Sequence, residues 1–274
     1  MSIAVYSPEY HPRIWSQLRD AFTRRELLFA LVQRDLKVRY KQTVLGVLWA
    51  VLPPLLLMVV FNVFLGRSGR VTSQGLPYPV FAYSGLLLWN YFSTVMSQAT
   101  TSIVSHQSVV SKVAFPREIL PWVPILGSGV DFLVASTIFA GLLAYYGVSV
   151  SWTALLAVPL LVIFVIFMGG LALLFAAFNT YFRDVRYFVP LMLQVWMFAS
   201  PVVYSTRDVP EWLQPYYVVI NPVAIIIDTY RQAVLWRTVP DPKVMVGLLV
   251  GAMAVFVFCY RVFKRAERRF ADVI

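Results

Sequence analysis

The sequence predicts an all-α polytopic membrane protein with six transmembrane helices, an N-terminal amphipathic helix at the membrane interface, and re-entrant helices between spans five and six. Of its 274 residues, 59% are hydrophobic and only 13% are charged, a balance that is not typical of soluble globular domains. The basic residues gather at the margins of long apolar segments, where lipid headgroups lie. Membrane insertion therefore explains the net charge of +10 better than nucleic-acid binding does.

Six apolar segments are each long enough to cross a hydrocarbon core of about 30 Å, which needs about 20 helical residues. They are residues 43–66, 79–104, 119–146, 153–178, 187–205 and 243–263. An even number of spans places both termini on one side of the membrane. All but six of the 23 lysines and arginines lie on that side, which the positive-inside rule assigns to the cytoplasm. We therefore expect a multi-pass protein of the cytoplasmic (inner) membrane with both termini in the cytoplasm.

These spans divide the chain into three regions. Residues 1–42 form a cytoplasmic and interfacial region, residues 43–263 the transmembrane domain, and residues 264–274 a basic cytoplasmic tail. In the first region, apolar side chains recur every four residues from Ile14 to Phe22, which predicts an amphipathic helix lying in the membrane interface.

A second helix is expected to begin at Thr23, which has capping-box spacing from Glu26. Asp35 and Arg39, at i and i+4, make its far end polar, so the chain leaves the lipid before it turns into span one. We interpret this elbow as a mechanical lever, and a simple amphipathic anchor is the alternative. Its basic residues stop where the apolar run begins, and they are Arg34, Lys37, Arg39 and Lys41.

Two cytoplasmic loops mix charged and apolar side chains. The loop 105–118 carries an apolar run from Val109 to Phe115 that Pro116 ends, and an apolar helix at a membrane surface needs a partner to cover it. The loop 178–188 places charges between aromatic residues. Together the loops predict a docking surface for another protein, while the alternative is that the first loop folds back on its own bundle.

Residues 206–242 are too polar for a full span and too apolar for an ordinary loop. Two short helices are predicted there, because Asp208 stands shortly before Pro210 and Asn221 directly before Pro222. The apolar run after the second proline is too short to cross the membrane. This region is expected to be re-entrant from the outer side, or alternatively to form an external cap.

Asp131 is an acidic residue deep within an expected span, where inserting an aspartate costs about 2.5–3.5 kcal/mol. It is a candidate functional residue, and a structural contact with Ser128 or Ser136 is the alternative. The single cysteine, Cys259, lies in the last span, so no cysteine-based metal site is expected.

Three blocks of the sequence resemble the permease subunits of ABC-2 type transporters, specifically the polysaccharide exporters of O-antigen, capsule and teichoic acid. The blocks are RDLKVRYKQTVLGVLWAVLPPLL at 34–56, LLLWNYFSTVMSQATTSIVSHQSVVSKVAFPREILP at 86–121 and NTYFRDVRYFVPLMLQVWMFASPVVY at 179–204. The resemblance runs from about residue 25 to the C-terminus and is closest to O-antigen permeases. It implies export of a lipid-linked polysaccharide across the cytoplasmic membrane, as in lipopolysaccharide biosynthesis.

The resemblance also implies a homodimer that pairs with two separate ATP-binding subunits. The sequence agrees, because it contains no G-x-x-x-x-G-K-[ST] loop: this chain is expected to be no enzyme and to bind no cofactor, with ATP and Mg held by the partner. In that family the loop between spans two and three carries a coupling helix that sits in a cleft of the ATPase. The expected coupling residues are Val109, Lys112, Val113, Phe115, Arg117, Glu118, Arg183, Asp184 and Arg186.

A moving polysaccharide requires many weak contacts, which aromatic faces, amides and hydroxyls supply. The candidate glycan contacts in spans two and five are Tyr83, Trp89, Asn90, Tyr91, Phe92, Gln98, Gln194, Trp196, Phe198 and Tyr204. Interfacial belts and lipid packing are the alternative for these aromatics. The family's glycans are attached to a polyprenyl pyrophosphate, so the four basic elbow residues are candidates for binding its anionic headgroup. A positive-inside cluster without a ligand is the alternative.

Two other functions compete with polysaccharide export. One is an ABC-2 permease for a different cargo, such as a teichoic acid, a lipid or a drug. The other is an ATP-independent channel or a membrane-embedded enzyme, and the scarcity of intramembrane acids, histidines and metal ligands argues against it.

Overall fold

The computed structural model describes residues 25–41, 43–66, 75–107, 116–210 and 221–268, together with Ser73 and Phe270. Within this part of the chain all regular structure is helical. The elements are α2 (Arg25–Tyr40), α3 (Leu48–Phe61), the π-helix η1 (Asn62–Gly66), α4 (Tyr78–Ser105), α6 (Ile119–Tyr145), the 3₁₀-helix η2 (Trp152–Leu156), α7 (Ala157–Tyr181), α8 (Val185–Phe198), the 3₁₀-helix η3 (Thr206–Asp208), α10 (Pro222–Val234) and α11 (Pro242–Glu267). The helix expected over residues 14–22 and the cap at Thr23 lie outside the described residues.

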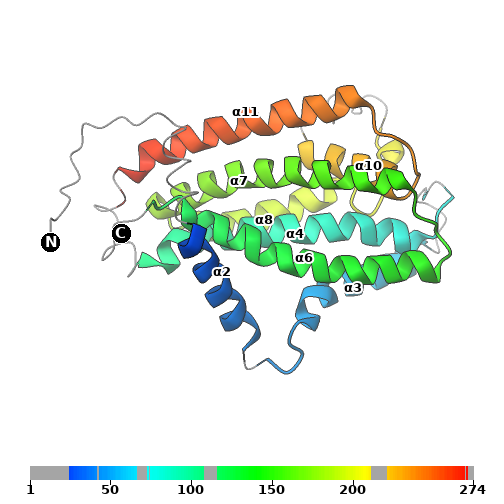
Figure 1. Ribbon diagram of the computed structural model, residues 1–274, viewed down its shortest axis with the longest axis horizontal. Coiled ribbons are helices and arrows are strands. Elements are labelled where there is room, and N and C mark those ends of the chain that lie inside the picture. Colours follow the sequence, from blue (N-terminus) through cyan, green and yellow to red (C-terminus); the bar gives the residue numbers. More distant parts are fainter. Residues whose placement is uncertain are drawn as a thin grey trace.

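The long helices lie side by side in one bundle (Figure 1). α4 packs against α3, α6, α7, α8 and α10, and most of its side chains are buried. Its hydroxyl groups donate to carbonyls one turn back, as Thr100 does to Met96 O and Ser102 does to Ala99 O, both at 2.7 Å. A comparatively polar helix is accommodated in the bundle because its neighbours shield it from lipid and its hydroxyls are hydrogen-bonded.

Four of the described helical segments are both long and apolar enough to cross a membrane: Leu48–Gly66, Ile119–Tyr145, Trp152–Tyr181 and Pro242–Glu267. The expectation of an all-α polytopic membrane protein is therefore confirmed. α4 has the length but is more polar, and α8 is apolar but has 14 residues, or about 21 Å of helix. The count of six spans stays a prediction.

Two of the expected span boundaries were wrong. Helix α3 begins only at Leu48, because residues 43–47 make a turn in which Gly46 has a φ of 51°. Helix α8 ends at Phe198 instead of running to residue 205. Pro201 has no backbone N–H to donate, and it disfavours helical geometry in the residue before it, so the chain turns at this point.

The helix after Pro222 begins as predicted. Asn221 is the N-cap of α10, and its side-chain oxygen accepts from the Ala224 N–H at 3.1 Å. Asp208, in contrast, pairs reciprocally with Ser205 to cap η3, and residues 211–220 lie outside the described part of the chain. α10 is largely buried against α4, α7 and η2.

The packing of α7 on α11 depends on Gly170. A Cβ at this position would lie 2.8 Å from Phe256 Cα and 3.1 Å from Phe256 N, which is too close to the backbone for any side chain. We expect Gly170→Ala to push α7 and α11 apart at a cost of about 2 kcal/mol. The melting temperature of the purified protein should then fall by about 4–8 °C.

Gly141→Ala is the matched control for this change. No atom lies within 4 Å of its Cβ position in α6, and alanine favours helix over glycine. An equal loss of melting temperature in both variants would contradict the role assigned to Gly170.

Candidate functional site

Helices α2 and α3 form a V-shaped hairpin that projects from the bundle (Figure 1). α2 packs on α6, and α3 packs on α4 and α6. The connection between them is solvent- or lipid-facing, since Val44 is fully exposed. The end of α2 and the start of α3 therefore meet the membrane helices from the same side.

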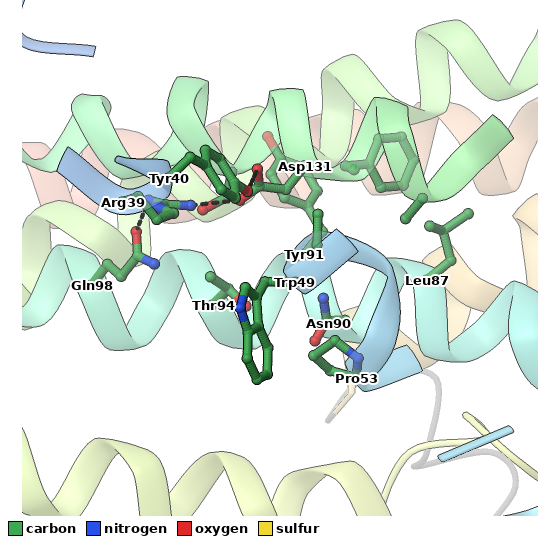
Figure 2. Close-up of a pocket in the computed structure, with 14 residues that line it drawn as sticks. Arg39, Tyr40, Trp49, Pro53, Leu87, Asn90, Tyr91, Thr94, Gln98 and Asp131 are labelled. Atoms are coloured by element: carbon green, nitrogen blue, oxygen red, sulfur yellow. Dashed lines mark hydrogen bonds and ion pairs between the residues drawn. The ribbon is translucent and has the colours of Figure 1, made fainter. Parts of the chain in front are cut away.

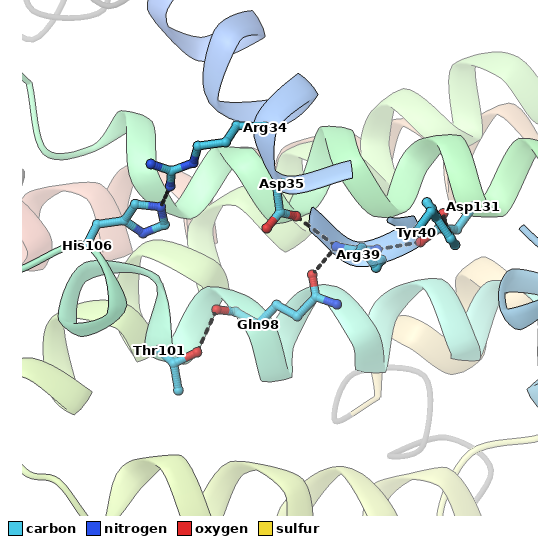
Figure 3. Close-up of polar contacts among 8 residues, drawn as sticks. All are labelled: Arg34, Asp35, Arg39, Tyr40, Gln98, Thr101, His106 and Asp131. Carbon is cyan, nitrogen blue, oxygen red and sulfur yellow. Dashed lines mark hydrogen bonds and ion pairs between the residues drawn. The ribbon is translucent and has the colours of Figure 1, made fainter. Parts of the chain in front are cut away.

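Polar residues at the end of α2 meet residues of α4 and α6 in one group, Asp35, Arg39, Tyr40, Gln98 and Asp131, which we call the Arg39 cluster (Figure 3). The Arg39 guanidinium donates to Asp131 Oδ2 at 2.5 Å, to Asp35 Oδ2 at 2.9 Å and to Gln98 Oε1 at 2.7 Å. The Tyr40 hydroxyl donates to Asp131 Oδ1. Because the Arg39 and Asp131 side chains are only 22% and 14% exposed, water screens this ion pair weakly.

The cluster gives Asp131 partners that the sequence did not indicate. Ser136, one of the two serines expected to contact it, donates instead to Phe132 O at 2.7 Å. Burial, assisted by the hydrogen bond to Asp131, raises the pKa of Tyr40 to about 12. At neutral pH the Tyr40 hydroxyl therefore keeps its proton and remains a donor to the carboxylate.

The other three basic residues of the elbow, Arg34, Lys37 and Lys41, are exposed. Arg34 contacts the ring of His106 at the end of α4 (Figure 3). The sequence grouped these three with Arg39, but the structure separates them, because only Arg39 is held by two carboxylates. The Arg34 contact attaches α2 to the start of the loop 105–118.

Residues 108–115 of this loop lie outside the described residues, and they include four expected coupling residues, Val109, Lys112, Val113 and Phe115. The end of the loop is described, and it is attached to α11. Arg117 donates its backbone N–H to Glu267 Oε1 at 3.2 Å and its guanidinium to Glu267 O at 3.1 Å. The carboxylate of Glu118 forms an ion pair with Lys264. Two expected coupling residues thus make contacts within their own chain.

Glu118 is a buried carboxylate, with 4% of its side chain exposed. Burial raises the pKa of Glu118 above its ordinary value, and the attraction of Lys264 offsets only part of that rise. Lys264 has a second partner, Glu267, at 2.9 Å. Lys264, near the C-terminal end of α11, therefore supplies the positive charge that favours the ionised form of Glu118.

This arrangement predicts unequal effects for the two partners. Lys264→Met leaves Glu118 without its cation and should cost about 2 kcal/mol, with a melting temperature about 4–8 °C below wild type at pH 8. Glu118→Gln leaves Lys264 paired with Glu267 and should cost less than about 1 kcal/mol. Because the pKa of Glu118 is raised in the folded state, the folded protein binds a proton at this carboxyl more tightly than the unfolded chain does. The protein therefore loses folding stability as the pH rises through that pKa. The Lys264→Met deficit should therefore shrink from pH 8 to pH 5.

Melting temperatures across this pH range test the prediction. The double variant Glu118→Gln/Lys264→Met should melt above Lys264→Met at pH 8. Arg265→Met, an exposed neighbour on α11, is the control and should melt like wild type. Equal, pH-independent losses in both single variants would contradict the burial argument.

The loop between α7 and α8 carries the remaining coupling candidates. Arg183, Asp184 and Arg186 are all exposed, and Arg186 lies over the Tyr187 ring at 4.6 Å. The loop is at the same end of the bundle as Arg117, because Tyr181 at the end of α7 donates to Ala266 O of α11 at 2.7 Å. Charged and aromatic side chains of two loops thus share one end of the molecule.

The glycan candidates divide into buried and exposed residues. Tyr83 and Tyr91 donate from α4 to Ala135 O and Ile125 O of α6, at 3.1 and 3.0 Å, and these contacts hold the two helices together. Trp89 and Phe92 are also buried in the core. Gln194 and Phe198 are exposed on α8. Trp196 and Tyr204 are partly buried: the Trp196 indole donates to Asn221 Oδ1 at 3.0 Å and the Tyr204 hydroxyl to Phe198 O at 3.0 Å.

A pocket of about 240 Å³ lies beneath the V-shaped hairpin, between α2, α3, α4 and α6 (Figure 2). Its polar lining includes the Arg39 cluster residues Arg39, Tyr40, Gln98 and Asp131. The full lining is Arg39, Tyr40, Trp49, Ala50, Pro53, Leu87, Asn90, Tyr91, Thr94, Gln98, Ser128, Asp131, Phe132 and Ala135. This pocket could not be predicted from the sequence, because its walls combine the α2–α3 hairpin with residues of α4 and α6 that lie far from it in the chain.

Arg231 on α10 is a second residue whose role the sequence did not show. It is one of the six basic residues that the sequence placed on the non-cytoplasmic side, yet its side chain is fully buried. Its guanidinium donates to Val202 O at 2.6 Å, to Pro201 O at 2.7 Å, to Phe81 O at 3.2 Å and to Ser84 Oγ at 3.1 Å. It therefore joins α10 to the start of α4 and to the turn that follows α8.

Comparisons with known proteins agree with this architecture. The family model described as ABC-2 type transporter matches residues 26–235. An O-antigen export system permease protein RfbA from Klebsiella pneumoniae is 28% identical over 91% of this chain and 95% of the relative. The protein of the same name from Myxococcus xanthus is 29% identical over 94% and 98%. The polysialic acid transport protein KpsM of Escherichia coli is 22% identical over 75% and 80%. The family resemblance predicted from the sequence is confirmed.

Proposed function

Because the chain belongs to the ABC-2 type transporter family, we propose that it is the membrane subunit of an ATP-driven exporter that carries a lipid-linked polysaccharide of O-antigen type across the cytoplasmic membrane. The O-antigen permeases that cover nearly the whole chain support this cargo. Separate ATP-binding subunits would drive export. Two of these subunits would assemble with a homodimer of this chain. Each copy of the chain would have six spans, with both termini in the cytoplasm.

The attachment of the loop 105–118 at both ends is the observation that carries the proposal. Its start is joined to the elbow helix through Arg34 and His106, and its end is joined to α11 through Arg117 and Glu118. A push on this loop by an ATPase would therefore reach α2 and α11 together. Because α2 is also joined to α6 through Arg39, the same push would reach the membrane helices.

The second loop would supply the lesser contact to the ATPase. Arg183, Asp184 and Arg186 are free to reach across an interface since their side chains are exposed at the same end of the bundle. Charge pairs of this kind align partners and set association rates.

Exposed residues are the better candidates for contacts with the cargo. On α8, Gln194 and Phe198 face away from the subunit core and would line a glycan path between two subunits. The residues that would bind the pyrophosphate of the lipid are Arg34, Lys37 and Lys41. Arg39 is less suited to an anion, because Asp35 and Asp131 already neutralise it.

Co-expression with a candidate ATP-binding subunit tests the function. We expect a stable complex, ATP-dependent appearance of the polymer at the cell surface, and loss of coupled ATPase activity in Phe115→Ala. Thr137→Ala, on an exposed face of α6, should behave as wild type. If a complex forms and hydrolyses ATP but exports a lipid or drug instead, the cargo assignment fails. If no ATPase associates, the transporter assignment itself fails.

A further inference from the structure

We propose that the pocket beneath the α2–α3 hairpin binds a single sugar ring of the exported polymer. This inference rests on the proposed function and adds a cargo-binding site to it. Four of the pocket's residues, Arg39, Asn90, Tyr91 and Gln98, were candidate cargo contacts from the sequence, and the structure adds the other ten residues of the lining. The proposal depends on the chemistry of the walls, on an unpaired buried hydroxyl, on the local charge and on the size of the space.

The walls of the pocket match the two faces of a sugar. Figure 2 shows Asn90, Thr94 and Gln98 along one helix, α4, together with Trp49 of α3. Amides and hydroxyls offer both donors and acceptors for sugar hydroxyls. Trp49 is 54% exposed and presents an amphipathic ring at the opening, where it can cover the C–H face of a sugar.

A buried hydroxyl in the wall lacks a partner. Ser128 is 2% exposed, and its Oγ has no hydrogen-bond partner among the residues that the structure describes. Leaving such a group unpaired costs about 1–3 kcal/mol. A helical serine commonly relieves this cost by bonding to a carbonyl one turn back, as Ser136 does on the same helix. The Ser128 hydroxyl therefore has unused hydrogen-bonding capacity in the wall of the pocket.

The charge of the Arg39 cluster selects against an anion. Arg39 is the one cation in the pocket lining, and it is already paired with Asp131, which also lines the pocket, and with Asp35, which does not. A phosphate or pyrophosphate entering there would meet like charge in a poorly screened site. A neutral, hydroxyl-rich group meets no such penalty.

The size of the pocket limits the occupant to one ring. A volume of about 240 Å³ is below the range of about 300–1,000 Å³ that is typical of sites for drug-sized ligands. One small site makes few contacts and binds weakly, which suits a polymer that must move on. The site would therefore hold successive sugars transiently, not retain the chain.

The chain offers a direct test, because Cys259 is its one cysteine and is easily replaced. In a Cys259→Ala background, Ser128→Cys places a thiol in the pocket wall. The complex with its ATPase, in lipid nanodiscs, would be treated with a small methanethiosulfonate reagent. We expect labelling to be slowed at least fivefold by the polysaccharide chain released from its lipid, and not by inorganic pyrophosphate. Asn90→Leu should abolish this protection without preventing labelling.

Ser149→Cys, at an exposed position that follows α6 and lies outside the expected spans, is the control and should be labelled without protection. Protection of Ser128→Cys by pyrophosphate to the same degree would overturn the choice of ligand. Failure of the reagent to label it, or labelling that the glycan does not slow, would overturn the site. Export by the wild-type complex in the same cells separates the two claims: if export occurs without protection, only this inference fails, and if no polymer is exported, the proposed function fails and this inference with it.

Discussion

Replacing the fully buried Arg231 with methionine is expected to destabilise the protein strongly. The change removes the guanidinium from Pro201 O, Val202 O, Phe81 O and Ser84 Oγ, all buried. The first two carbonyls lose this donor, whereas Phe81 O still accepts from the Ser84 hydroxyl. Each unsatisfied buried group costs about 1–3 kcal/mol, so we expect a total of about 4–5 kcal/mol. The purified protein should melt more than about 10 °C below wild type.

Two further variants keep this prediction testable if Arg231→Met does not accumulate. Arg231→Lys retains the charge with three donors and should lose about half as much stability. Gly85→Ala, on α4, should disrupt the hydrogen bond between Arg231 and Val202 O. The added Cβ would lie 2.2 Å from Val202 O and 2.5 Å from Arg231 Nη2.

Arg237→Met is the matched control for Arg231. It removes an exposed arginine whose guanidinium donates to Ser149 O at 2.9 Å, and it should cost less than about 1 kcal/mol. If Arg231→Met melts within about 2 °C of the control, the buried contacts of Arg231 contribute little and its role has been misjudged.

The apolar helices were predictable because their signal is local. A long run without charge must be helical in lipid, so the segments around α3, α6, α7 and α11 follow from composition and length. The start of α10 was also local, since Asn221 and Pro222 specify an N-cap and a first turn. The start of α3 and the end of α8 were harder to predict, because the turn at Gly46 delays the first helix and Pro201 ends the second within apolar sequence.

The candidate sites were only partly predictable because their partners are distant in sequence. Asp131 was identifiable as an unusual acid and Arg39 as a basic elbow residue, but 92 positions separate them and no pattern joins them. Arg231 was harder still, since its main acceptors are backbone carbonyls, which every residue carries. Charge-counting rules treat an arginine as an exposed charge, and they fail where the backbone solvates it.

The second large effect is expected from the ion pair that joins α2 to α6. Arg39→Met leaves two carboxylates, Asp35 and Asp131, near each other without their cation, whereas Asp131→Leu leaves Arg39 still bound to Asp35 and Gln98. We expect Arg39→Met to cost about 3 kcal/mol and Asp131→Leu about 1–2 kcal/mol. Melting temperatures of the two single variants and the double variant form the test.

The double variant distinguishes a direct interaction from two separate contributions. If the pair acts directly, Arg39→Met/Asp131→Leu should be more stable than the sum of the single losses predicts, by about 1–2 kcal/mol. Gln33→Met, at an exposed position on α2, should match wild type in stability and in export. If the elbow transmits movement as proposed, the double variant should fold yet export poorly, because α2 would no longer be held to α6. Additive losses, or normal export by the double variant, would show that α2 reaches the membrane helices by another route.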